Sequence, residues 1–257
     1  MVTIKMIGYN ISESFNVVRW CLTLIAFAFV AVVSVAKYIQ LSDMTSITYS
    51  SLETTYLILN DTMSVIYIYL PLYVFLMCGL MFDDNFGALE VVKCESRGKW
   101  YLGKWVTLLV YTILFFLCLL GMNLIICNQV FQYSTSWSRD FLRVQVMMGQ
   151  SAKNFMYDPI QTIGMSLISV FFLYLVVGML SMFFSLYLGK EAYAFILSLV
   201  LGILISILFV YGLKITGQMS IQAFLWRNGF LLCGTGIVGG IGLLHTYKKD
   251  FNLEYRL

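Results

Sequence analysis

Residues 159–189 read PIQTIGMSLISVFFLYLVVGMLSMFFSLYLG, a run of 31 residues without Asp, Glu, Lys or Arg. A helix needs about 20 apolar residues to cross the hydrocarbon core of a bilayer. Such a helix satisfies its own backbone hydrogen bonds, as it must where no water is available. The run therefore predicts a membrane-spanning helix. Because the run is longer than one crossing requires, we expect its first residues to form an interfacial or partly re-entrant stretch.

The composition of the whole chain leads to the same class of protein. Of its 257 residues, 60% are hydrophobic and only 11% are charged, whereas soluble domains carry about 25% charged residues. A water-soluble fold of this length could not bury so much apolar surface, which argues against soluble enzymes, nucleic-acid-binding proteins and disordered chains. The apolar residues also come in long unbroken runs, unlike the alternation of a transmembrane β-barrel.

Charged residues divide the chain into six apolar runs in all. The other five cover residues 20–36, 62–82, 105–127, 192–213 and 228–247. We therefore predict an all-α integral membrane protein in which residues 1–257 form one transmembrane domain with six transmembrane helices. An even number of crossings places both termini on the same side of the membrane.

The distribution of Lys and Arg predicts which side that is. With both termini in the cytoplasm, 10 of the 16 basic residues fall on the cytoplasmic side, as the positive-inside rule favours. The loop 82–104 is then cytoplasmic, and the segments 38–61 and 128–158 lie outside. Segment 128–158 mixes aromatic and charged residues, so we expect short amphipathic helices at the outer surface.

Residues 1–19 carry a helical apolar pattern of their own. Ile4, Ile7, Ile11, Phe15 and Val18 recur at steps of three and four residues, which places them on one face of a helix. The pattern predicts an amphipathic helix lying on the inner leaflet. A disordered N-terminal tail is the alternative.

The most informative charged segment is residues 82–105, FDDNFGALEVVKCESRGKWYLGKW. Two aspartates are suited to the start of a helix, and apolar residues four and three apart then share one face of it. Such a helix at a cytoplasmic membrane surface is suited to docking a soluble partner, although an ordinary positively charged loop is the alternative. The candidate docking residues are Phe82, Asp83, Asp84, Phe86, Gly87, Leu89, Glu90 and Arg97.

Residues that could carry catalysis are sparse. His245 is the only histidine, and no apolar run has a charge near its middle. Residues 98–105 match a phosphate-binding loop up to the last position, where Trp105 replaces the hydroxyl that holds magnesium. We therefore predict no catalytic residue, no metal site and no cofactor site in this chain.

Polar and small residues inside the runs are candidates to line a pathway or to pack helices together. Asn123 is the clearest polar residue within a run, Ser181 and Ser185 lie one helical turn apart, and Gly236 and Gly240 do the same. Small residues let membrane helices approach closely, so packing accounts for most of them without a pathway.

The layout resembles the ABC-2 type permease, the transmembrane subunit of an ABC transporter. In that family, the loop after the second span often runs from an acidic residue through an aromatic residue and a glycine to a basic residue. A Gly-Lys pair then opens the third span. Here Asp83, Phe86, Gly87, Arg97 and Gly103-Lys104 stand in that order. The resemblance covers the whole chain in layout and is specific over 82–105.

The resemblance implies a function and a set of partners. Segment 82–104 would form a coupling helix that docks into a cytoplasmic ABC ATPase. Two copies of that subunit, which binds ATP and Mg, would serve a dimer of this chain with itself or a related chain. The complex would export an amphipathic cargo, such as a peptide antibiotic, a toxin or a lipid-like compound, across a bacterial cell membrane, for efflux or self-immunity. No nucleic-acid partner is expected.

Two other functions remain open from the sequence. One is an integral-membrane enzyme acting on lipid or peptide, which would need a polar cluster within the spans. The other is a non-catalytic scaffold or sensor subunit, which would have the same spans without a coupling loop.

Overall fold

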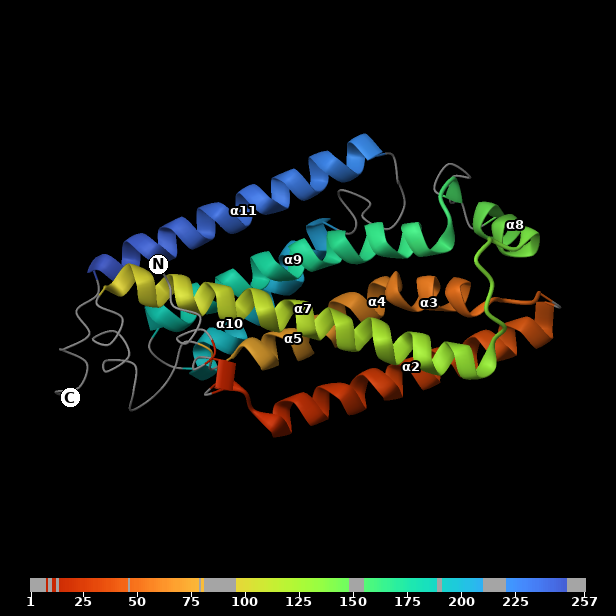
Figure 1. The fold of residues 1–257 in the computed structure, drawn as a ribbon, viewed down its shortest axis with the longest axis horizontal. Coiled ribbons are helices and arrows are strands. Elements are labelled where there is room, and N and C mark those ends of the chain that lie inside the picture. The colour runs from red at the N-terminus through yellow and green to blue at the C-terminus, as the bar shows by residue number, and fades with distance from the viewer. Residues whose placement is uncertain are drawn as a thin grey trace.

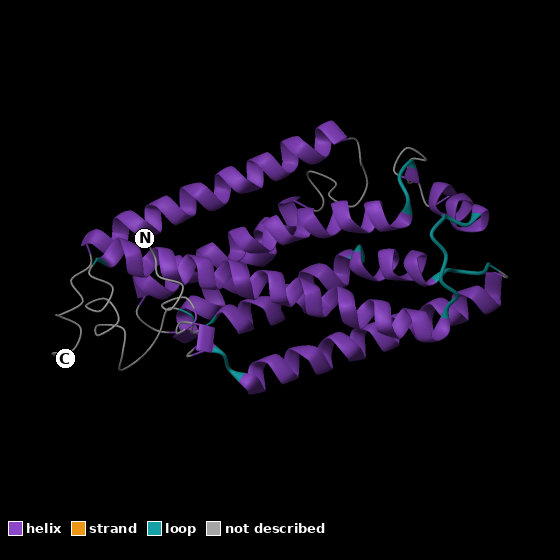
Figure 2. Cartoon of the chain, viewed as in Figure 1, coloured by secondary structure: helices purple, strands orange, loops and turns teal. Residues whose placement is uncertain are grey.

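The computed structural model describes residues 8, 11–12, 14–45, 47–78, 80, 96–147, 155–188, 191–209 and 221–248. Within these residues the chain is all-helical and has no strand (Figure 2). The elements are α2 (Val17–Thr45), α3 (Ser51–Leu59), α4 (Thr62–Ser64), the π-helix η1 (Val65–Tyr69), α5 (Leu70–Met77), α7 (Arg97–Val130), α8 (Arg139–Met147), α9 (Pro159–Leu188), α10 (Glu191–Ile207) and α11 (Ile221–Lys248).

The long helices lie side by side in an elongated bundle (Figure 1). Helix α9 is its centre, because it packs against α3, α5, α7, α10 and α11. Helix α2 begins and α11 ends at one end of the bundle, which we call the Arg19 end. The opposite end carries α8, and we call it the α8 end. Successive long segments run along the bundle in alternate directions.

Four helices are long and apolar enough to cross a membrane: α2, α7, α9 and residues 224–246 of α11. A fifth candidate is the broken pair formed by α3 and residues 62–77, which bends by 48°. Helix α10 is shorter, with 17 residues. The all-helical class is confirmed, and among the described residues the number of candidate crossings is four, or five with the bent pair.

The outer faces of the bundle are apolar. Helix α2 exposes Leu22, Ile25 and Phe29, and α11 exposes Phe230 and Ile237. Exposed apolar faces of this length would drive a soluble protein to aggregate, whereas in a bilayer they contact lipid tails. The surface is therefore compatible with a multi-pass membrane protein.

Helix α9 differs from the expectation of a re-entrant start. It is one continuous helix of 30 residues that begins at Pro159, a residue well tolerated at the first helical position because its missing N–H has no helical partner there. At about 1.5 Å per residue the helix is roughly 45 Å long, which exceeds the hydrocarbon thickness of about 30 Å. The extra length is therefore continuous helix, and no re-entrant break interrupts it.

The described part of the N-terminal segment agrees with the prediction only in part: Gly8, Ile11, Ser12 and Ser14 are helical, but the helix does not continue to residue 19. Phe15 and Asn16 are not helical, and α2 begins at Val17, so Val18 belongs to the first long helix. Ile11 packs against the core, and the Tyr111 hydroxyl of α7 donates to its carbonyl oxygen at 2.9 Å. The end of the predicted interfacial helix is therefore attached to the bundle.

Helix α3 lies where the sequence predicts an outer loop. Its residues Ser51, Thr54 and Thr55 are fully buried, and the helix packs on α7 and α9. The two threonine hydroxyls donate to backbone carbonyls four residues earlier, at 3.0 and 2.8 Å. The two threonines can occupy the interior because their hydroxyls find partners in the backbone one turn earlier, whereas the buried Ser51 hydroxyl has no partner among the described residues.

Candidate functional site

Most of the predicted docking residues lie outside the described part of the chain. These are Phe82, Asp83, Asp84, Phe86, Gly87, Leu89 and Glu90. Arg97 is described and is the first residue of α7, where the Ser96 hydroxyl caps the helix by accepting the Lys99 N–H at 3.2 Å. Residues 98–105 therefore lie within a helix, and they do not form the open loop that would hold a phosphate.

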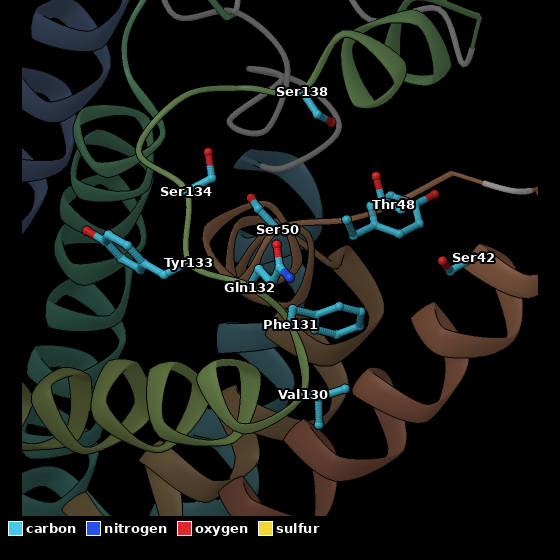
Figure 3. A pocket seen from close by; sticks show the side chains of 10 residues that line it. Ser42, Thr48, Ser50, Val130, Phe131, Gln132, Tyr133, Ser134 and Ser138 are labelled. Carbon is cyan, nitrogen blue, oxygen red and sulfur yellow. The ribbon is translucent and has the colours of Figure 1, made fainter.

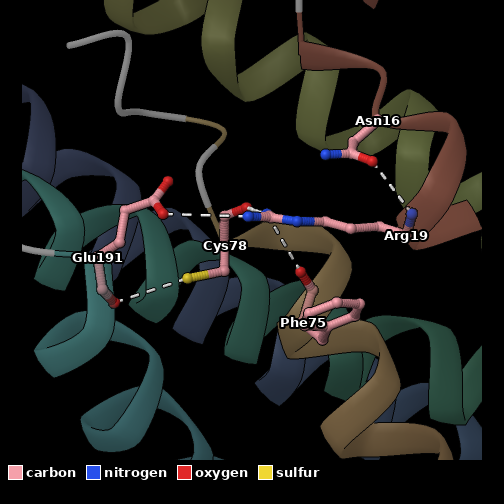
Figure 4. Close-up of polar contacts among 5 residues, drawn as sticks. All are labelled: Asn16, Arg19, Phe75, Cys78 and Glu191. Atoms are coloured by element: carbon pink, nitrogen blue, oxygen red, sulfur yellow. Dashed lines mark hydrogen bonds and ion pairs between the residues drawn. The ribbon is translucent and has the colours of Figure 1, made fainter.

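A polar cluster joins three helices at the Arg19 end (Figure 4). Arg19 extends from the start of α2 to the carboxyl end of α5, where its guanidinium donates to the carbonyl oxygens of Cys78 and, at 3.5 Å, Phe75. Its other terminal nitrogen lies 4.0 Å from the carboxylate of Glu191, the first residue of α10. The Cys78 thiol donates to the Glu191 carbonyl at 3.6 Å.

Arg19 acts mainly as a cap for α5. The last carbonyls of a helix lack intrahelical partners and carry a partial negative charge, so a guanidinium there is favourable. The Glu191 side chain is 44% exposed, and ion pairs at that exposure contribute little. In the sequence, Arg19 directly precedes the first apolar run. In the structure, its guanidinium contacts the carboxyl end of α5, which belongs to the second run.

The middle of the bundle contains an irregular helical segment. Residues Val65–Tyr69 form a π-helix, in which the Leu70 N–H bonds the Val65 carbonyl. The Tyr174 hydroxyl of α9 donates to the same carbonyl at 2.6 Å. Short π-helical turns are frequent at functional sites. Here a buried hydrogen bond joins the start of the π-helix to α9.

Arg227 and Asn228 of α11 are buried against α9. Each residue is 6% exposed, and the Arg227 guanidinium donates to the Ser169 hydroxyl at 2.7 Å. The amide oxygen and nitrogen of Asn228 have no hydrogen-bond partner among the described residues. An ionisable residue within a membrane helix marks a candidate pathway or binding site. The pair stands at the start of the last apolar run in the sequence, and the structure buries it.

Among the predicted polar candidates, Asn123, Ser181 and Ser185 are buried. The Asn123 amide donates to the Leu119 carbonyl of its own helix at 2.8 Å, and its oxygen has no partner in the described ranges. Ser181 and Ser185 lie on the buried surface of α9, the helix that packs against α10 and α11. These three residues therefore belong to the packed interior.

Gly236 and Gly240 face away from the rest of the described chain. A Cβ atom built on either would meet nothing within 4 Å. The close approach is made by Gly239 instead, where a Cβ would lie 2.8 Å from the Met179 side chain, and by Gly242, which lies against the Tyr101 hydroxyl. Helix packing within this chain thus uses different glycines from the predicted pair.

The α8 end is held together by aromatic rings and one buried carboxylate. Trp137 stacks on Phe141, with ring centroids 5.0 Å apart, and both contact Tyr56 of α3 edge-on. The Glu53 carboxylate is fully buried and accepts backbone N–H groups. Burial, and then the charge of Glu53, raises the pKa of Tyr49 above its ordinary value, so this tyrosine is neutral at physiological pH. The predicted amphipathic helix in segment 128–158 is present as α8.

No group of three or more His, Cys, Asp or Glu residues able to hold a metal ion occurs in the described ranges. No protein-family model, curated protein or solved structure matches this chain. A proposal for the function therefore rests on the residues and their geometry.

Proposed function

We propose that this chain is the permease subunit of an ATP-driven ABC-2 type exporter, with six transmembrane crossings and both termini in the cytoplasm of a bacterial cell. Its support is the apolar bundle together with the order of residues in segment 82–104. Helix α5 ends and α7 begins at the Arg19 end, the end at which α2 begins and α11 ends. The proposed coupling segment connects α5 to α7, on the side where a cytoplasmic ATPase would bind.

The observation that carries the proposal is the contact of Arg19 with the end of α5. The proposed coupling segment follows Cys78, whose carbonyl accepts from Arg19. The same guanidinium faces Glu191 at the start of α10. A displacement of the coupling segment by ATP binding in the partner would therefore act on α2, α5 and α10 together. The Arg19 contacts would therefore transmit a movement of the coupling segment to the membrane helices.

The pair Arg227 and Asn228 supplies polar groups for a cargo. The two residues lie between α9 and α11, close to the Ser169 hydroxyl, in a bundle whose outer faces are apolar. An amphipathic cargo needs such a combination, because its polar part requires hydrogen bonds while its apolar part tolerates lipid. A peptide antibiotic, a toxin or a lipid-like compound fits this description.

The enzyme alternative has less support. It requires a nucleophile or an acid–base pair within the spans. Among the described residues, the buried carboxylate of Glu53 accepts two backbone N–H groups, and the Ser169 hydroxyl accepts from Arg227. These groups are engaged in structural hydrogen bonds, so neither is placed as a general base for the other.

Gene context and co-purification test the proposal. We expect a neighbouring reading frame that encodes a nucleotide-binding ATPase, and we expect that protein to co-purify with this chain in mild detergent. Replacing Phe86 with Asp should weaken docking about thirtyfold, because an aromatic anchor worth roughly 2 kcal/mol is lost and a carboxylate is forced against the partner.

The matched control is Ala88→Asp, which places the same carboxylate on the opposite face of the predicted helix. Both variants should reach the membrane at the wild-type level, since neither adds positive charge to the topology signal. Equal ATPase recovery with wild-type, Phe86→Asp and Ala88→Asp protein would contradict the coupling role of this segment.

A further inference from the structure

A cavity of about 470 Å³ opens at the α8 end (Figure 3). It lies between the end of α2, the segment 47–50 before α3, and residues 130–138, which begin at the last residue of α7. Its volume is within the range of small-molecule binding pockets. The lining residues are Ser42, Thr48, Tyr49, Ser50, Val130, Phe131, Gln132, Tyr133, Ser134 and Ser138.

The lining is polar and uncharged. Eight of these ten residues carry a hydroxyl or an amide, and none carries a formal charge. A hydroxyl can donate and accept at once, and the Gln132 amide offers both functions. Phe131, Tyr49 and Tyr133 add flat aromatic rings. A ligand that suits this lining is neutral, has many donors and acceptors, and has apolar faces that can lie on a ring.

The walls of the cavity are fixed by buried hydrogen bonds. The Glu53 carboxylate accepts the Ser50 N–H at 2.7 Å with one oxygen and the Ser138 N–H at 2.5 Å with the other. The Ser51 N–H donates to the Gln132 carbonyl at 3.0 Å. Two segments that are far apart in the sequence are thereby held in a fixed relation, so the cavity exists before a ligand binds.

We propose that this cavity binds an uncharged sugar, either free or as the head group of a glycolipid. Sugar hydroxyls can pair with the side chains of Thr48, Tyr49, Gln132 and Tyr133 in the lining, whereas the Ser42 and Ser134 hydroxyls already donate to the backbone carbonyls of Ile47 and Ser136. The C–H faces of a sugar ring pack on aromatic side chains. An ionic head group would find no charge of opposite sign in the lining. A peptide that binds by strand addition needs an exposed strand edge, and the described residues contain no strand.

The binding site does not depend on transport. It lies at the end of the bundle opposite the proposed coupling segment, and it is complete within this chain. Under the proposed orientation it faces the outside of the cell, where glycolipids and free sugars are both encountered. If this chain is not an ABC permease, the cavity can still bind a sugar. If the cavity binds no sugar, the chain can still be an ABC permease.

Saturation-transfer NMR on the purified chain in phosphatidylcholine nanodiscs tests the proposal. The probes are glucose, galactose, N-acetylglucosamine and maltose at millimolar concentration, with glucose 6-phosphate and a blocked alanine tripeptide for comparison. We expect transfer to the ring protons of at least one neutral sugar, and none to the tripeptide. Adding a neutral galactolipid to the nanodiscs should reduce the signal if the natural ligand is a head group, and leave it unchanged if the ligand is a free sugar.

The variant Gln132→Leu keeps the backbone bond to Ser51 and removes the side-chain amide from the cavity. It should lower sugar affinity by about fivefold or more. The matched control is Gln161→Leu, the same change at an exposed position of α9 outside the cavity. No transfer to any neutral sugar, equal loss in both variants, or preference for the tripeptide or the phosphorylated sugar would overturn the proposal.

Discussion

The Glu53 carboxylate accepts the backbone N–H of Ser138, 85 residues further along the chain, at 2.5 Å. Its second oxygen closes a capping box with Ser50 at the start of α3. One buried side chain thus fixes the beginning of α3 and the segment that precedes α8. The α8 end depends on this carboxylate, because a buried backbone N–H left without an acceptor is costly.

Replacing Glu53 with Ala should therefore destabilise the protein strongly. The buried Ser50 N–H and the partly buried Ser138 N–H lose their acceptor, and we expect a loss of at least ~2 kcal/mol. The measurement is the midpoint of thermal unfolding in detergent. Asp140→Ala is the control, because that carboxylate is 54% exposed and should shift the midpoint little. Equal midpoints for the two variants would refute the structural role of Glu53.

Asn228→Leu should stabilise the protein while impairing its function. The amide of Asn228 is buried without a partner among the described residues, and an apolar side chain of similar size removes that cost, which is of order 1 kcal/mol. If the amide serves a cargo, transport falls although the unfolding midpoint rises. A lowered midpoint would show instead that the amide stabilises the fold.

Arg19→Gln and Glu191→Gln should differ in their effects. The arginine change removes the cap on the α5 carbonyls, whereas the glutamate change removes only a partly exposed ion pair worth under about 1 kcal/mol. We expect the larger loss of stability, and of ATPase-coupled transport, in Arg19→Gln. Equal losses in both variants would show that the ion pair, rather than the cap, is the important contact.

Gly242→Ala and Gly240→Ala form a matched pair on α11. A Cβ at residue 242 would collide with the buried Tyr101 ring, whereas one at residue 240 meets nothing within 4 Å. Overpacking costs roughly 1–3 kcal/mol, and alanine is otherwise favoured over glycine in a helix by about 0.5–1 kcal/mol. Unfolding midpoints should therefore fall for Gly242→Ala and stay level or rise for Gly240→Ala. The reverse order would be incompatible with the packing of α11 on α7.

Thiol labelling in intact cells tests the orientation. A cysteine introduced at Ser136, which is exposed at the α8 end, should react with a membrane-impermeant maleimide. Cys94, in the segment proposed to be cytoplasmic, should react only after permeabilisation. Labelling of Cys94 alone in intact cells would invert the proposed topology.

The sequence by itself determined that this protein is a bundle of apolar helices. Where a run of uncharged residues such as 159–189 excludes water, the backbone can form hydrogen bonds only within its own helix. Each of the six predicted runs contains helical residues of the described structure. The sequence also predicts an amphipathic helix within segment 128–158, where α8 lies, and a helix over 228–247, which α11 contains. Segment 82–92, on which the coupling prediction rests, lies outside the described residues.

Tertiary structure alone decided which polar residues became part of the interior. Ser50-x-x-Glu53 is a local capping signal for α3, but the short polar helix could equally have remained at the surface. Its burial required α7, α9 and the distant Ser138 N–H. In the sequence, Arg227 and Asn228 stand at the start of an apolar run. In the structure both residues are buried, and Arg227 donates to Ser169 of α9. Hydrogen bonds between segments far apart in sequence have no local pattern, so only the packed bundle reveals them.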